Sequence, residues 1–274
     1  MAERRTLESE GAVPPLPDTE SAWFLDIDGT LLEIAPTPST VKVEDGLPEL
    51  IRRLHQRCAG ALALITGRPV SDVDRLFPGL RLPVAGQHGL ERRDATGTVH
   101  RHPPEDADLP WLSALVKATV ARLEGVWVED KGLSIAVHYR ANPAAQAAVD
   151  AALRGVLVDA GAALSLQPGK CVLEIKPAGR DKGSAIREFM AEQPFAGRRP
   201  IFVGDDVTDE FGFAEVNGLG GLAVKVGEGE TAAPWRLRDV GEVHAWLAKT
   251  LADAPAGSLQ EEHNNALTGS RAHR

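Results

Sequence analysis

An apolar run that ends abruptly in two acids and a glycine is the feature that most constrains this 274-residue chain. The tripeptide Trp-Phe-Leu at 23–25 predicts a buried β-strand, and it is followed directly by Asp26-Ile27-Asp28-Gly29-Thr30. A carboxylate is costly to bury unless a cation or hydrogen bonds compensate it, so a buried strand that ends in Asp26 and Asp28 indicates a functional site. Since two acids cannot hold an anionic substrate alone, we expect a divalent cation between them.

Three later segments also place polar groups at a strand end or a helix start. Thr66 follows a predicted strand at 61–65, Lys182 precedes a predicted helix, and Asp205 follows a predicted strand at 200–203. Taken singly, Thr66 is equally consistent with a helix N-cap. The alternation of strands and helices predicts an α/β fold with a doubly wound, Rossmann-like parallel sheet, in which the site lies at the carboxyl ends of the strands.

Residues 102–176 differ in pattern from the segments on either side. They read as helix, hairpin, helix and hairpin, which predicts a compact α+β cap inserted into the core, with the second hairpin turning at Pro168-Gly169. We therefore assign 21–101 and 177–252 to the catalytic core. We expect residues 1–20 to be a flexible N-terminus and 253–274 to be a disordered tail.

Composition limits the classes of partner. The formal net charge of -9 argues against general binding to nucleic acid or to an anionic membrane. No apolar run approaches the length of a membrane span, and the first residues lack the apolar core of a signal peptide, so we expect a cytoplasmic protein. The two cysteines, Cys58 and Cys171, are typical of apolar filler residues.

The segment that begins at Asp26 resembles the first signature, DxDGT, of the haloacid dehalogenase-like phosphohydrolases. Thr66, Lys182 and the segment Gly-Asp-Asp-Val-Thr-Asp at 204–209 resemble the second, third and fourth signatures, in the same order. The resemblance implies that Asp26 is the nucleophile and that Asp28 is the general acid and base. It also implies that Thr66 holds a phosphoryl oxygen and that Lys182 neutralises the nucleophile and the phosphate.

The same resemblance implies that Mg²⁺ is the cofactor. Its expected protein ligands are Asp26, Asp28 and Asp205, while Asp206 and Asp209 are expected to orient Lys182 or waters on the metal from an outer position.

Six segments narrow the resemblance to trehalose-6-phosphate phosphatases over about residues 22–250. They are FLDIDGTLLEIAPTP, ITGRP, AGQHGLERR, GLSIAVHYR, GKCVLEIKP and FVGDDVTDEFGF. The resemblance implies Mg²⁺-dependent hydrolysis of trehalose 6-phosphate to trehalose and phosphate through an aspartyl-phosphate, in a pathway where a trehalose-6-phosphate synthase acts before it. The partner is thus a small sugar phosphate.

Substrate contacts are carried over by motif. Lys170 and Glu174 of the cap are the expected sugar contacts, together with Arg140. Further expected contacts, near the phosphate and in the segment 87–93, are Asp26, Ile27, Asp28, Gly67, Arg68, Gln87, His88 and Arg93.

Two other functions stay open. Another sugar phosphatase or a phosphosugar mutase of the same superfamily would carry a similar core and cap, and a mutase would need a bisphosphate activator. A non-catalytic sugar-phosphate sensor would keep the cap but should lack one of the acids or the lysine.

Overall fold

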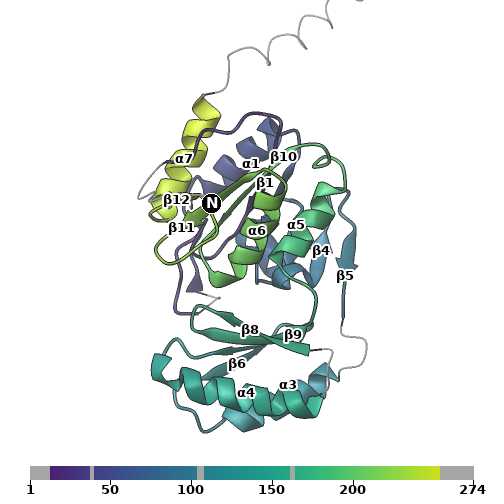
Figure 1. Ribbon diagram of the computed structural model, residues 1–274, viewed down its shortest axis with the longest axis vertical. Helices are drawn as coiled ribbons and strands as arrows, with labels where there is room; N and C mark the ends of the chain where they lie inside the picture. The colour runs from purple at the N-terminus through teal and green to yellow at the C-terminus, as the bar shows by residue number, and fades with distance from the viewer. Residues whose placement is uncertain (1–12, 38–39, 104–107, 161–163, 254–274) are drawn as a thin grey trace, which may run out of the picture.

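The strand that ends at the first acid lies inside the larger of two sheets (Figure 1). The computed structural model describes residues 13–37, 40–103, 108–160 and 164–253. Within these ranges the larger sheet has eight strands in the order β12-β11-β10-β1-β2-β3-β4-β5. They are β1 Ser21–Leu25, β2 Leu62–Ile65, β3 Val84–Gly86, β4 Glu91–Arg93, β5 Val99–Arg101, β10 Arg199–Gly204, β11 Leu222–Val226 and β12 Trp235–Leu237.

Helices cover both faces of this sheet. Trp23 and Phe24 are consecutive in β1 and therefore point to opposite faces. Trp23 packs on Trp246, with ring centroids 5.3 Å apart, and Phe24 packs on Phe189 at 6.1 Å. The core helices are α1 Leu47–Arg57, α2 Val70–Leu76, α5 Lys182–Met190, α6 Glu210–Gly218 and α7 Val240–Ala252. The predicted α/β core with helices on both faces is confirmed.

Only part of the sheet is parallel. The strands from β12 to β3 pair in parallel, whereas β4 and β5 add to the edge in antiparallel fashion. The sheet is therefore mixed, because the short connection through η2 Gln87–Gly89 and the hairpin turn near Asp94 and Gly97 each reverse the chain without a crossover helix.

A second, four-stranded sheet with the order β6-β7-β9-β8 builds the cap within the described residues. Its strands are β6 Trp127–Asp130, β7 Ile135–His138, β8 Leu164–Gly169 and β9 Val172–Pro177, and its helices are α3 Leu109–Val120 and α4 Gln146–Ala160. Val137 and Leu173 pair across β7 and β9 and belong to the apolar cluster beneath the helices. The neighbouring pair Ala136 and Glu174 consequently faces the core.

The second cap hairpin turns two residues later than expected. Pro168 and Gly169 belong to β8, and the turn consists of Lys170 and Cys171, the latter at φ 60°. The register pairs Gly169 with Val172, and Pro168 is tolerated because β8 is an edge strand. Lys170 therefore stands at the tip of the hairpin that faces the core.

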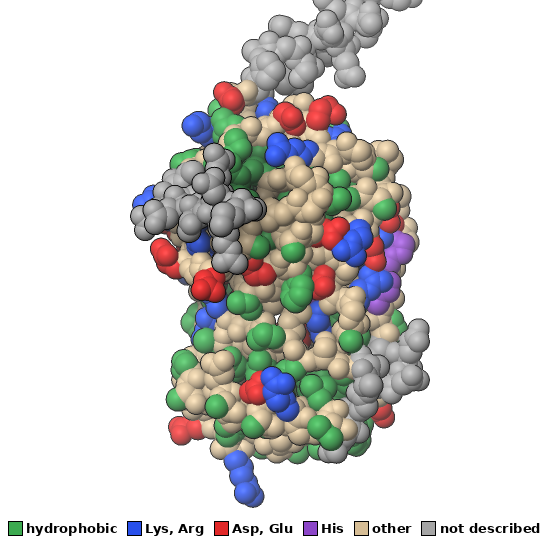
Figure 2. Space-filling view, in the orientation of Figure 1, with side chains coloured by type: hydrophobic (Ala, Val, Ile, Leu, Met, Phe, Trp, Pro, Cys, Tyr) green, Lys and Arg blue, Asp and Glu red, His purple; other side chains and the backbone are tan. Residues whose placement is uncertain are grey.

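Two chain segments connect core and cap, one after β5 and one after β9. His102 lies on the first and Arg180 on the second, and a nitrogen of Arg180 is 3.1 Å from Nδ1 of His102. Arg180 also pairs with Glu188 of α5, which in turn accepts a hydrogen bond from Arg92. Figure 2 shows charged and histidine side chains gathered on this side of the molecule, next to α5 and β5. These ion pairs fasten both connections to the core.

The ends of the chain lie mostly outside the described residues, which exclude 1–12 and 254–274, so the expected flexible N-terminus and disordered tail stay predictions. Pro14 is buried, and its carbonyl accepts a hydrogen bond from the indole of Trp246 at 3.2 Å. Among the described helices, none has the length and apolar character that a membrane crossing requires.

Candidate active site

Three neighbouring parallel strands end at one edge of the core sheet. Asp26 follows β1, Thr66 follows β2 and Asp205 follows β10, and all three side chains are buried. Gly29 allows the close approach of Asp205, because a Cβ atom at Gly29 would lie 2.2 Å from the Asp205 carboxylate. With φ at 84°, Gly29 also has a backbone conformation that favours glycine.

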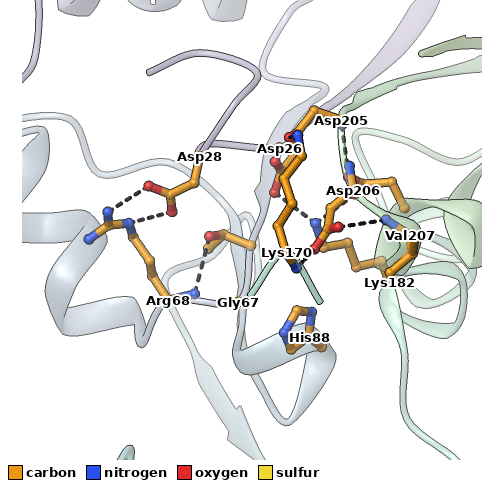
Figure 3. A network of polar contacts seen from close by, with 12 residues as sticks. Asp26, Asp28, Gly67, Arg68, His88, Lys170, Lys182, Asp205, Asp206 and Val207 are labelled. Carbon is orange, nitrogen blue, oxygen red and sulfur yellow. Dashed lines mark hydrogen bonds and ion pairs between the residues drawn. The ribbon is translucent and has the colours of Figure 1, made fainter. Parts of the chain in front are cut away.

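Lys182 is buried between two carboxylates, and Figure 3 shows it next to one of them, Asp26. Its Nζ atom lies 2.8 Å from Oδ1 of Asp26 and 2.6 Å from Oδ1 of Asp209. The N-cap residue Asp181 and Ser184 form a capping box that starts α5 here. Burial alone would lower the pKa of Lys182, but Asp209 and Asp26 raise it above its usual value, so the lysine stays charged.

The acid cluster, defined as Asp26, Asp205 and Asp209, fits a divalent cation. One carboxylate oxygen from each of these buried residues lies within 4.8 Å of the others. Burial raises the pKa of Asp26 well above its usual value, and Asp209 and Asp205 act in the same direction against Lys182. The buried Oδ1 atom of Asp205 has no hydrogen-bond partner among the described residues. Hard oxygen donors of this kind suit Mg²⁺, which would offset the repulsion between the acids.

Within this cluster, both carboxylate oxygens of Asp209 already accept hydrogen bonds from the protein. Its Oδ1 accepts from Lys182, and its Oδ2 accepts from the backbone N–H groups of Asp205 and Asp206, at 2.9 and 2.8 Å. Asp26 and Asp205 are therefore better placed than Asp209 to bind a metal directly. The carboxylate of Asp206 accepts from the N–H of Val207 and thus caps the short helix η4 Val207–Asp209.

The carboxylate of Asp28 lies apart from the acid cluster. Nε and a terminal nitrogen of Arg68 each donate to it at 2.6 Å, which is a bidentate ion pair. Asp28 is about one third exposed, whereas Arg68 is buried. Thr66 accepts a hydrogen bond from the N–H of Arg68 at 3.1 Å, and both residues line the same cleft as Asp28. Figure 3 shows Arg68 beside Asp28.

The predicted cap residues do reach the core. Nζ of Lys170 lies 2.6 Å from Oδ2 of Asp205, and its backbone N–H donates to Asp206. Glu174 is buried, and its Oε2 is 3.3 Å from Nε2 of His88. Arg140 donates to the carbonyl of Lys170 and lines the same cleft.

Lys131, in the connection between β6 and β7, is a residue of the site that the sequence patterns do not single out. Its Nζ donates to Glu174 at 3.0 Å and to the carbonyl of Gly67 at 3.0 Å, and thereby joins cap and core. The spacing Glu-x-Lys at 129–131 is the only local signal, and it does not tell this lysine from a solvated one.

His88 stands between the two parts of the site. It has φ 57°, and a Cβ atom at Gly67 would lie 2.7 Å from its Nε2, so Gly67 leaves the room that the ring occupies. Burial lowers the pKa of His88, although Glu174 opposes this effect. The imidazole is therefore mostly neutral near pH 7, and Lys131 supplies the positive charge beside Glu174.

Three other predicted contacts do not line the cleft. Gln87 is buried and accepts from Ser134 of the cap at 3.2 Å, which makes it a link between domains. Arg93 turns away and binds the carbonyl of Leu82 and the carboxylate of Asp74. The side chain of Ile27 is buried in the core, and its carbonyl accepts the N–H groups of the following turn.

The cleft between core and cap contains most of the remaining predicted residues. Its lining includes Asp26, Asp28, Thr66, Gly67, Arg68, His88, Arg140, Lys170, Glu174, Lys182, Asp205 and Asp206, together with Glu129, Lys131 and His138. Carboxylates, a buried lysine and a cation from the cap thus converge on one concave site, which can accept a phosphate ester.

A mixed sheet whose central parallel strands carry these groups at their ends, beneath an inserted α+β cap, defines a haloacid dehalogenase-like phosphatase. The fold is similar to a solved trehalose-6-phosphate phosphatase related protein, with a TM-score of 0.67 and 28% identity over 84% of this chain and 96% of that one. It also resembles the C-terminal domain of a C. albicans trehalose-6-phosphate phosphatase, with a TM-score of 0.76 over 89% of this chain and 99% of that one; at 18% identity this likeness concerns the fold alone.

Sequence comparison gives the family. The chain is 46% identical over 226 residues to the trehalose-6-phosphate phosphatase of Escherichia coli strain K12, covering 82% of this chain and 85% of that one. It is 47% identical over 206 residues to a probable trehalose-phosphate phosphatase of Sinorhizobium fredii, covering 75% and 77%. Residues 24–240 match the trehalose-phosphatase family, and the chain belongs to that family of enzymes.

Proposed function

We propose that this chain hydrolyses trehalose 6-phosphate to trehalose and phosphate in a Mg²⁺-dependent reaction that passes through an aspartyl-phosphate on Asp26. The observation that carries the proposal is the position of Lys182 between Asp26 and Asp209, at 2.8 and 2.6 Å. A phosphate dianion repels an attacking carboxylate, and a buried, charged lysine offsets that repulsion.

Asp26 and Asp205 would hold the metal, with Asp209 behind them. When bound, Mg²⁺ would supply charge stabilisation for the phosphoryl oxygens. Asp209 would fix both Lys182 and the loop that carries Asp205, since its two oxygens accept from Lys182 and from the backbone of that loop. Asp206 would hold the cap hairpin through the N–H of Lys170.

In the first half-reaction a carboxylate oxygen of Asp26 attacks phosphorus, and the bond between phosphorus and the sugar oxygen breaks. Asp28 donates a proton to the leaving sugar oxygen. In the second half-reaction Asp28 removes a proton from water, whose oxygen attacks the same phosphorus and frees Asp26. Arg68 positions the ionised form of Asp28, which is the form that acts as base on the water. The hydroxyl of Thr66 with the N–H of Gly67 binds the transferring group.

Substrate choice would come from the cap. Glu174 presents a buried Oε1 atom that has no hydrogen-bond partner among the described residues, and Lys170 reaches the phosphate end of the cleft. Such charged groups favour a sugar whose hydroxyls can pair with them and disfavour one that leaves them unpaired. The substrate would be supplied by a trehalose-6-phosphate synthase.

Phosphate release from a panel of sugar phosphates, with Mg²⁺ and after its removal by a chelator, tests the proposal. We expect trehalose 6-phosphate to have the highest kcat/KM and the reaction to stop without Mg²⁺. Isomerisation of a sugar phosphate that needs a bisphosphate and releases little phosphate would indicate a mutase. Binding of trehalose 6-phosphate without turnover would indicate a sensor.

A further inference from the structure

Two aromatic rings stack on the side of the cap sheet that faces the core. The register pairs Trp127 of β6 with His138 of β7. Their ring centroids are 4.0 Å apart, and the ring planes differ by 9°. Trp127 and Glu129 are two residues apart in one strand and share a face, which is the face that closes over the catalytic cleft.

The contacts on this face hold the stack in position. Nε2 of His138 lies 2.8 Å from Oε2 of Glu129, so the imidazole beneath the indole cannot rotate without losing this contact. Both His138 and Glu129 are about one fifth exposed. The indole thus rests on a ring that is itself anchored, which reduces the conformational entropy that a ligand would have to remove on binding.

The indole borders a hollow that continues from the catalytic cleft. Trp127, Asp72 and Leu76 are among the residues that line this hollow. Arg68 and Glu129 line both the hollow and the cleft. Because Arg68 also binds the Asp28 carboxylate, the hollow begins next to the group that would protonate the leaving sugar.

Trp127 keeps 38% of its surface exposed, although it lies on the cap face that is turned toward the core. A large aromatic side chain that is held flat on one face and open at the edge of a concave site is typical of a ligand contact. The charged groups of Arg68, Asp72 and Glu129 lie around it.

From this arrangement we infer that the Trp127 indole is the platform for the second, unphosphorylated hexose of a disaccharide phosphate. A pyranose ring has C–H groups on its faces and hydroxyls around its rim. The C–H face would pack on the indole, while the hydroxyls would meet the surrounding charged groups. The inference rests on the proposed function and deepens it, since it assigns the part of the cleft that distinguishes a disaccharide from a monosaccharide.

A contact to the distal hexose does not change as the phosphoryl group is transferred. It therefore contributes equally to substrate and transition-state binding, and its loss should raise KM with little change in kcat. A substrate that lacks the second ring cannot use this contact. The ratio of kcat/KM values for a long and a short substrate is thus the quantity that the platform controls.

Steady-state kinetics of the full chain with Trp127→Ala, Trp127→Phe and Trp111→Ala tests the inference. Trp111 is a matched control, because it is an exposed tryptophan on the cap helix α3. For Trp127→Ala we expect the ratio of kcat/KM for trehalose 6-phosphate to that for p-nitrophenyl phosphate to fall about tenfold, through KM. Trp127→Phe should recover most of the loss, and Trp111→Ala should leave the ratio unchanged.

Equal losses of kcat/KM on both substrates, or a loss in kcat alone, would contradict the inference that Trp127 contacts the second hexose. Circular dichroism and urea unfolding of each variant separate a binding effect from misfolding. If Trp127→Ala unfolds, Trp127→Leu takes its place, because leucine keeps the site apolar but has no ring. The same ratio of kcat/KM values for the two substrates should then fall in Trp127→Leu. Failure of the unmodified chain to hydrolyse trehalose 6-phosphate would instead overturn the proposed function, so the two failures are distinguishable.

Discussion

The Nζ atom of Lys170, at the tip of the cap hairpin, lies 2.6 Å from Oδ2 of Asp205, which follows strand β10 of the core. Asp205 is almost fully buried, whereas about half of the Lys170 side chain is exposed. The cap therefore places a positive charge directly beside the acid cluster. Closure of the cap brings its own cation to the end of the cleft where a phosphate would bind.

This contact predicts a selective defect when the cap groups are removed. Lys170→Ala and Glu174→Ala should each lower kcat/KM for trehalose 6-phosphate at least about tenfold, which corresponds to about 1.4 kcal/mol. The loss should be smaller for p-nitrophenyl phosphate, which does not fill the sugar part of the cleft. The difference should be clearest for Glu174→Ala, because Lys170 also reaches the acid cluster at the phosphate end. Lys117→Ala, at an exposed position of α3, is the matched control. If both substrates lose rate equally, these residues support closure, and the sugar contacts lie elsewhere.

Asp26→Asn should abolish turnover while the protein still folds. An amide has the same shape as a carboxylate but is not a competent nucleophile. It also removes one of the two acids that contact Lys182, so we expect a modest change in stability beside the loss of activity. Phosphate release by freshly purified variant checks this expectation, and substantial residual activity would contradict the assignment of Asp26.

Asp28→Asn should slow both half-reactions, because one side chain acts first as acid and then as base. The sugar leaves as an alkoxide and needs a proton, whereas p-nitrophenolate is a good leaving group. In single-turnover phosphorylation we therefore expect the aryl phosphate to lose much less rate than trehalose 6-phosphate. An equal loss for the two substrates would show that Asp28 is not the acid.

Asp205→Ala should weaken the response to Mg²⁺ more than Asp206→Ala does. Asp205 is buried, and its Oδ1 has no hydrogen-bond partner in the described part of the chain, whereas Asp206 caps η4 and accepts from the N–H of Lys170. Activity titrated against Mg²⁺ shows which variant needs the higher Mg²⁺ concentration. Calorimetric titration of Mg²⁺ into each variant measures the same ranking of affinities without turnover. The reverse ranking would transfer the ligand role to Asp206.

Glu174 predicts a pH-dependent contribution to stability. Burial alone would raise its pKa, but Lys131 and His88 hold the pKa well below the ordinary value of 4.5. A carboxyl whose pKa is lower in the folded state stabilises the fold fully above its unfolded pKa, and this contribution is lost as the pH falls toward the folded value. Glu174→Gln should therefore lower the urea midpoint at pH 7 more than at pH 3.5. An unchanged difference between these two pH values would contradict the ion pair with Lys131.

The sequence by itself determined the edge of the core sheet at which the site lies. Apolar runs that end in Asp26, Thr66 and Asp205 are local patterns, and parallel strands bring their carboxyl ends to one edge whatever the details of packing. Lys182, which begins α5, was predictable only together with these acids and through the family resemblance, because a lone lysine at a helix start is usually solvated. Lys170 and Glu174 were predictable only through family resemblance.

Only the tertiary structure decided which charged side chains enter the cleft. Arg93 was expected there, but β4 lies within the core sheet, and its guanidinium is used by Asp74 and Leu82. Lys131 lines the cleft, and the stacked ring of Trp127 borders the adjoining hollow, because the folded cap packs on the core. Such contacts join residues far apart in the chain, and they depend on strand pairing and docking that no local pattern of residues encodes.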